Sequence, residues 1–239
     1  MQNSLGIASE IGHRYHMIAA RLFLGVLYAE WFAPDEAREQ FESALALAQE
    51  LRSPTWIQAI LGALAGAYLH LEDHKSAQSC LESAISPQTS MDTVGKRYCW
   101  LQRAELALAQ GDPALALDIT ERLIASAPGM SPEQVITFLW KLKGKALAAI
   151  GSKEEALHLL HDALENAKAA EERFLLWRVH ACLGRLYQDL GRQDLAEKEI
   201  ESAQAIVDEM AVTMPDERLK AQFRESTCRI LEIPLKKST

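Results

Sequence analysis

Apolar and small residues return along this chain with the spacing of amphipathic helices, and the whole pattern returns about every 40 residues. The clearest unit lies between Leu183 and Ala203. Leu183 and Tyr187 are four positions apart and share one helical face. Gly191 then interrupts the pattern where a helix C-terminus is expected, and Ala196 and Ala203 lie seven apart on one face of the next stretch. The pattern predicts two helices joined by a short turn.

The same unit aligns five times along the sequence. An alanine in the second helix recurs at spacings of 40, 39, 40 and 40 residues, at Ala37, Ala77, Ala116, Ala156 and Ala196. A small residue precedes it by twelve positions in the first helix, at Gly25, Ala65, Ala104, Gly144 and Gly184. Small residues let two helices approach closely. One pair of helices cannot bury its apolar face alone, so stacked neighbours are expected.

The repeat sets the predicted boundaries. Five helical pairs are expected at residues 14–52, 54–87, 92–128, 131–170 and 172–212. Residues 1–13 align at a shift of 40, with Ser4 at the place of Ala44, which predicts the tail of a preceding repeat. This indicates a piece of a longer polypeptide, and a natural N-terminal cap is the alternative. Residues 215–232 are expected to form a capping helix that completes a single domain, 1–232, before a flexible tail, 233–239.

Composition fits a helical protein of the cytoplasm. Hydrophobic residues make up 49% of the chain and charged residues 24%, without the alternation of a sheet. The formal charge of −8 argues against direct nucleic-acid binding. The four cysteines form no CxxC pair, as in a reducing compartment. The longest apolar run, Ile60 to Leu69, is too short to cross a membrane, and Gly62 and Gly66 within it indicate a buried helix contact.

No catalytic motif stands out in the sequence. A phosphate-binding loop, GxGxxG, GxSxG and HExxH are all absent, and Gly144-Lys145-Ala146 lacks the rest of a phosphate loop. His158 and His161 lie one helical turn apart, but a metal site needs a third ligand, so packing or solvent-facing histidines are expected. The sequence predicts no enzyme activity, no cofactor and no metal.

Over residues 1–212 the repeat resembles that of the tetratricopeptide repeat (TPR) proteins. The matching residues are Leu24-Gly25-x2-Tyr28 with Ala37-x3-Phe41, Trp140-x3-Gly144, and Leu183-Gly184-x2-Tyr187 with Ala196. The resemblance implies an all-α, right-handed α-solenoid of five 40-residue hairpins. The third repeat departs most from the pattern, with Ala104, Ala107 and Thr120 at signature positions.

A narrower resemblance rests on the 40-residue period, the start inside a repeat and the segment Pro215 to Phe223. These features are similar to the C-terminal repeat region of bacterial signalling ATPases and transcription regulators, including those related to the maltose-operon activator and those attached to nucleotide cyclases. The resemblance implies a sensor or partner-binding region with an ATPase module upstream.

The family's inward positions imply a candidate binding groove on the first helices. In the N-terminal repeats these positions are small and apolar. From the third repeat on they give Tyr98, Leu101, Phe138, Lys141, Lys145, Arg178 and Arg185. Four cations on two adjacent helices of an acidic protein repel one another unless an anion lies between them, which favours an acidic peptide or a phosphate-bearing ligand. The alternative is a solvated face that Glu105 and Asp189 partly neutralise.

The leading functional hypothesis is therefore a non-catalytic scaffold that binds a protein or peptide, as part of a larger bacterial signalling protein. The second is a small-molecule sensor region that regulates an attached ATPase or DNA-binding module. The sequence names neither the partner nor the oligomeric state.

Overall fold

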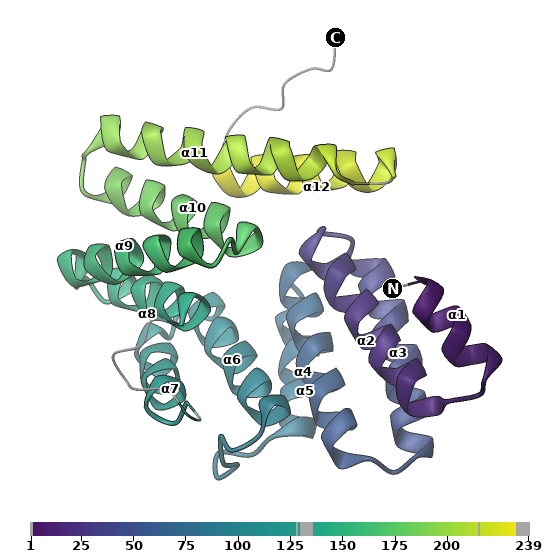
Figure 1. Cartoon of the computed structure of the whole chain (residues 1–239). Helices are drawn as coiled ribbons and strands as arrows, with labels where there is room; N and C mark the ends of the chain where they lie inside the picture. The colour runs from purple at the N-terminus through teal and green to yellow at the C-terminus, as the bar shows by residue number, and fades with distance from the viewer. Residues whose placement is uncertain (1, 128, 130–135, 215, 233–239) are drawn as a thin grey trace. The chain divides into compact units, whose positions relative to one another are not determined.

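The computed structural model describes residues 2–127, 129, 136–214 and 216–232 (Figure 1). Across these residues it contains helices and no strand. The helices are α1 Gln2–Glu10, α2 Arg14–Glu30, α3 Pro34–Glu50, α4 Pro54–His70, α5 His74–Ala84, α6 Val94–Ala109, α7 Pro113–Ala125, α8 Thr137–Ala149, α9 Lys153–Ala169, α10 Arg173–Asp189, α11 Gln193–Val212 and α12 Glu217–Leu231. The all-α prediction is confirmed.

The contacts of the chain form two compact units, residues 1–112 and 113–239. In the first unit, α2 packs on α3 and α4 on α5, with α1 against α2 and α6 against α4. In the second, α8 packs on α9 and α10 on α11, with α7 against α8 and α12 against α11 (Figure 1). The boundary falls in the turn of the predicted third repeat, so that α6 belongs to the first unit and α7 to the second.

Small residues face large ones inside three of the helical pairs, as the repeat predicts. A Cβ placed on Gly25 would meet the ring of Phe41, one on Gly144 would meet Leu160, and one on Gly184 would meet Ile200. The partner lies 16 residues after the glycine each time, on the second helix of the pair. The alanine column is wholly buried, at Ala37, Ala77, Ala116, Ala156 and Ala196.

The turn predicted at Gly191 is present in the structure. Gly191 follows the C-cap of α10 with a φ of 69°, a left-handed conformation that favours glycine. The Arg192 N–H donates to the Tyr187 carbonyl at 2.8 Å, which ties off the end of the helix. The expected start of the fourth repeat, at 131–133, and the tail, 233–239, lie outside the described residues.

Candidate functional site

The candidate groove residues fall in both units. Tyr98 and Leu101 lie on α6 in the first unit, while the remaining five lie on α8 and α10 in the second: Phe138, Lys141, Lys145, Arg178 and Arg185. Within the second unit α8 and α10 pack against each other. The structure thus brings the four cations onto two neighbouring helices, as expected. Their role as a binding site stays a prediction.

Tyr98 fills space between helices of the first unit. A Cβ on Gly62 of α4 would lie 3.1 Å from Tyr98 Cδ1 and 3.1 Å from Cys99 Sγ, so the glycine allows α6 to approach α4. Gly66 lies against the Gln102 side chain in the same way. Burial, with smaller contributions from Glu30 and Cys99, raises the pKa of Tyr98 to about 12. Tyr98 therefore packs as a neutral phenol, and Leu101 beside it is half-buried.

Lys141 differs from the solvent-facing groove cation that the sequence suggests. The residue is only 6% exposed, and its Nζ lies 4.4 Å from the centre of the Phe138 ring. An ammonium group over an aromatic face is attracted by the negative charge density of the ring. Phe138 and Lys141 thus form one packed pair on α8, while Lys145, one turn further on, is half-buried.

The two candidate arginines of α10 have partners within the second unit. Arg178 Nη1 donates to the Phe174 carbonyl at 2.7 Å, and its guanidinium lies 4.8 Å from the Trp177 ring centre. Arg185 Nη2 donates to the Ile230 carbonyl at 2.7 Å and lies 3.9 Å from Glu232 Oε1. Arg185 therefore contacts the C-terminal end of α12, where a positive charge is favoured by the helix dipole.

Two polar contacts, one between α10 and α11 and one between α9 and α10, were not singled out by the sequence. His180 Nδ1 lies 2.6 Å from Glu199 Oε2, with both side chains largely buried. His161 Nε2 lies 2.8 Å from the Tyr187 hydroxyl. Burial raises the pKa of Tyr187, and the charge of Glu199 adds to the rise. Spacing along α10 signals neither contact, because the partners of His180 and Tyr187 lie on two other helices.

The two histidines of α9 do not form part of a larger ligand set. Across the described residues, no group of three or more His, Cys, Asp or Glu side chains could hold a metal ion. His161 instead contacts Tyr187, in keeping with the packing role expected for it. No helix among the described residues combines the length and the apolar character needed to span a bilayer.

Comparison with solved structures shows the fold. BtubC (BKLC) from P. vanneervenii is 17% identical with a TM-score of 0.59, over 90% of this chain and 91% of that one. A thermophilic TPR protein of Thermus thermophilus is 20% identical with a TM-score of 0.56, over 88% and 98%. Nearly identical TPR-like repeats assigned to a kinesin light chain of Podosopora anserina are 22% identical with a TM-score of 0.52, over 84% and 98%.

The chain has a TPR-like fold. No protein-family model matches the sequence, and no curated protein matches it either. The similarity to these solved structures confirms, at the level of fold, the resemblance to TPR proteins seen in the sequence. The narrower resemblance to signalling ATPases is not confirmed by these structures and stays a prediction.

Proposed function

We propose that the chain is a non-catalytic interaction scaffold that binds a segment of a protein partner along α8 and α10. The TPR-like fold supports the proposal, because stacked helical pairs present extended surfaces for binding. The observation that carries it is the gathering of three at least partly exposed cations, Lys145, Arg178 and Arg185, on two packed first helices in a chain with a net charge of −8. A segment rich in Asp and Glu has the complementary charge.

Two of the candidate cations are ordered by an aromatic neighbour on the same helix. Phe138 with Lys141, and Trp177 with Arg178, place a cation against an aromatic ring on each helix. Such pairing restricts the cationic side chain before binding, which lowers the entropy lost on association. Arg185 is about half exposed, and its guanidinium has five N–H donors, so the bond to Ile230 leaves donors for a carboxylate.

A random peptide library displayed on phage and selected on the full chain tests the proposal. The selected peptide, labelled with a fluorophore, is then titrated at rising salt. We expect enrichment of acidic sequences, and weaker binding as salt screens the charges. Lys145→Glu and Arg178→Glu should each weaken binding about tenfold or more. Lys198→Glu, on the exposed face of α11, is the matched control and should change affinity little.

The outcome that contradicts the proposal is equally clear. Selected peptides without acidic bias, or peptides that bind Lys145→Glu and Arg178→Glu as tightly as the parent, would show that the cations of α8 and α10 do not bind the partner. Circular dichroism of each variant excludes unfolding as the cause of a loss.

We further propose that the scaffold belongs to a larger cytoplasmic signalling protein of a bacterium. The 40-residue period and the segment 215–223 support this through their resemblance to the repeat regions of signalling ATPases. An immunoblot of the source cells tests it. A band far above 26.6 kDa is expected, and a band near 26.6 kDa would contradict it.

A further inference from the structure

The C-terminal end of α12 lies against one of the candidate cations. The helix packs on α11, runs back along it and ends beside α10 (Figure 1). There Arg185 Nη2 donates to the Ile230 carbonyl at 2.7 Å and lies 3.9 Å from Glu232 Oε1. The end of α12 therefore presents a backbone carbonyl and a carboxylate to Arg185, the same two groups that an acidic peptide would present.

The carbonyl contact has a structural role. The last four carbonyls of an α-helix have no partner within the helix, and Ile230 is next to last in α12. Arg185 satisfies this carbonyl and places a positive charge where the helix dipole favours it. Glu232 caps the helix with its backbone, since its N–H donates to the Arg229 carbonyl at 3.3 Å and its φ is 56°. Its carboxylate is thus not part of the cap.

The carboxylate contact is a weak one. The side chains of Arg185 and Glu232 are 53% and 71% exposed, and 3.9 Å is beyond hydrogen-bonding distance. Exposed ion pairs of this kind contribute little to stability, because water and salt screen them. A guanidinium binds a carboxylate best through two parallel N–H···O bonds. A partner's carboxylate that forms both bonds would therefore replace Glu232 readily, whereas a neutral peptide would not.

We propose that Glu232 competes with an acidic partner for Arg185 and so regulates binding at the cationic surface, defined here as Lys145, Arg178 and Arg185. The inference rests on the proposed function, since it concerns control of that same site. Without a partner, the carboxylate lies beside one of three gathered cations and offsets part of their mutual repulsion. On binding, it moves aside. Segments with few acidic residues are disfavoured, because they gain too little to displace it.

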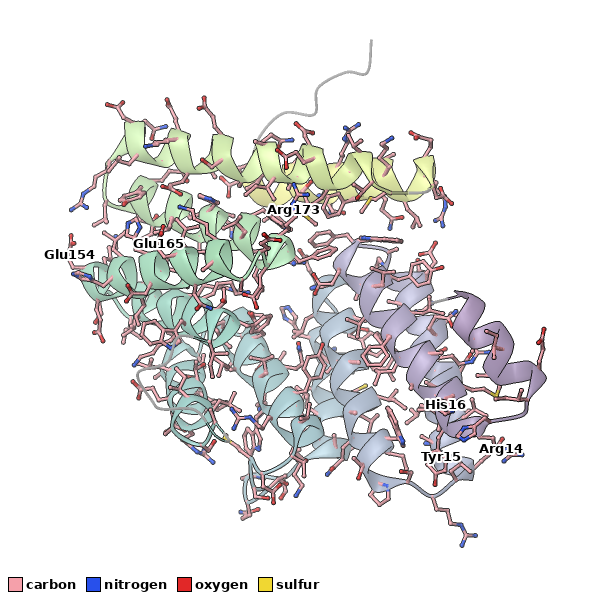
Figure 2. The ribbon with its side chains drawn as sticks, viewed as in Figure 1. Arg14, Tyr15, His16, Glu154, Glu165 and Arg173 are labelled. Atoms are coloured by element: carbon pink, nitrogen blue, oxygen red, sulfur yellow. The ribbon has the colours of Figure 1, made fainter. Side chains whose placement is uncertain are left out.

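A second pair of an arginine and a glutamate on α10 provides a comparison. Arg173, at the start of α10 (Figure 2), pairs with Glu209 of α11. The two side chains are 47% and 66% exposed, close to the values for Arg185 and Glu232. Because α11 is the second helix of the same pair, this contact joins the two helices, and Arg173 is not one of the inward positions. Removing the charge of Glu209 therefore changes the net charge as Glu232→Gln does, without uncovering a candidate cation.

The test uses the full chain and a fluorophore-labelled hexaglutamate peptide, titrated by fluorescence anisotropy at low salt. Glu232→Gln should bind the peptide about threefold more tightly than the parent, which is the scale of an exposed ion pair. Glu209→Gln is the matched control and should bind as the parent does. The advantage of Glu232→Gln should shrink as salt rises, since the competition is between charges.

A double-mutant cycle assigns the effect to the contact. In chains that already carry Arg185→Gln, the further change Glu232→Gln should give no gain, because the two residues act through one another. Glutamine keeps N–H donors for the Ile230 carbonyl, so α12 stays in place, and circular dichroism with thermal melting checks each variant. A gain that persists without Arg185 would overturn the inference, since Glu232 would then act by general charge.

The outcomes separate this inference from the proposed function. If Glu232→Gln binds as the parent does while Lys145→Glu and Arg178→Glu still weaken binding, Glu232 is no competitor and the proposed function stands. If the peptide binds neither the parent nor Glu232→Gln, both are wrong. Binding to Glu232→Gln but not to the parent would support the inference most strongly, because the surface of the free chain would then be closed by its own carboxylate.

Discussion

Contacts between a glycine and a large side chain set the distance between the helices of a pair. Gly25, Gly144 and Gly184 each lie against the side chain 16 residues later on the second helix. In the second repeat the first-helix position is Ala65, and it shares a buried core with Leu81, the residue 16 positions later. A side chain added at one of the glycines therefore needs room that the second helix already fills.

Gly25→Ala should destabilise the chain despite the higher helix propensity of alanine. The new Cβ would come within 2.6 Å of Phe41 Cδ1, and a ring held in the core cannot move away cheaply. We expect the free energy of unfolding to fall by about 1–2 kcal/mol in urea titrations.

Gly6→Ala is the control for that experiment. A Cβ at Gly6 of α1 meets nothing within 4 Å, so alanine there should be neutral or slightly stabilising. Adding Phe41→Leu to Gly25→Ala should recover part of the loss. If Gly25→Ala is as stable as Gly6→Ala, the close approach of α2 and α3 does not restrict position 25 to glycine.

The titration of Tyr98 should make stability fall at alkaline pH. The pKa of its phenol is about 12 in the folded chain, chiefly because of burial, against about 10 in an unfolded chain. A raised pKa means that the folded state holds the proton more tightly, so this contribution is complete below pH 10 and is lost as pH rises toward 12. Relative to pH 9, the chain should lose about 1 kcal/mol more than Tyr98→Phe at pH 11.

Urea titrations of both proteins from pH 8 to 11.5 give this difference. Tyr98→Phe keeps the ring that packs on Gly62 but has no hydroxyl to ionise. Parallel curves for the two proteins would show that Tyr98 is open to water in solution.

Among whole elements, α12 is capped at its N-terminus by a side chain. Asp216 accepts from the Arg218 N–H at 2.7 Å and the Leu219 N–H at 3.3 Å, which satisfies donors that the helix leaves unpaired. Asp216→Ala should cost about 1 kcal/mol and raise hydrogen exchange across residues 217–231. Ser152→Ala is the matched control, because Ser152 occupies the N-cap position of α9 but its side chain forms no capping hydrogen bond. Equal exchange in the two variants would mean that packing alone holds α12.

The helices and turns could be predicted because their signals are local. The alanine position of Ala37 is fully buried in all five repeats, so the period revealed it directly. The turn position of Gly191 was revealed by the glycines of the last three repeats, while Phe32 and Glu72 hold the same left-handed conformation in the first two.

The burial and partners of the candidate groove residues were predicted less fully. Lys141 and Arg185 are long side chains whose positions depend on neighbours that the repeat does not specify, the Phe138 ring for one and the end of α12 for the other. Their burial and partners follow from tertiary packing, which spacing along one helix does not encode.

At the scale of the whole molecule, the open question is how the two compact units unfold. The sequence predicts one domain over residues 1–232, since each helical pair needs a neighbour to bury its apolar face. Contacts nevertheless concentrate within residues 1–112 and within 113–239. A single domain predicts that both units open in one cooperative transition, and separate domains predict two.

Native-state hydrogen exchange at rising urea distinguishes these cases. Core amides of α4, in the first unit, and of α10, in the second, should approach the same opening free energy and the same dependence on urea if the chain is one domain. Gly25→Ala sharpens the comparison, because its clash lies wholly within the first unit. In one cooperative domain this variant should lower the opening free energy of α10 as much as that of α4. A loss confined to α2–α5 would contradict the single domain and would show that the two units unfold separately.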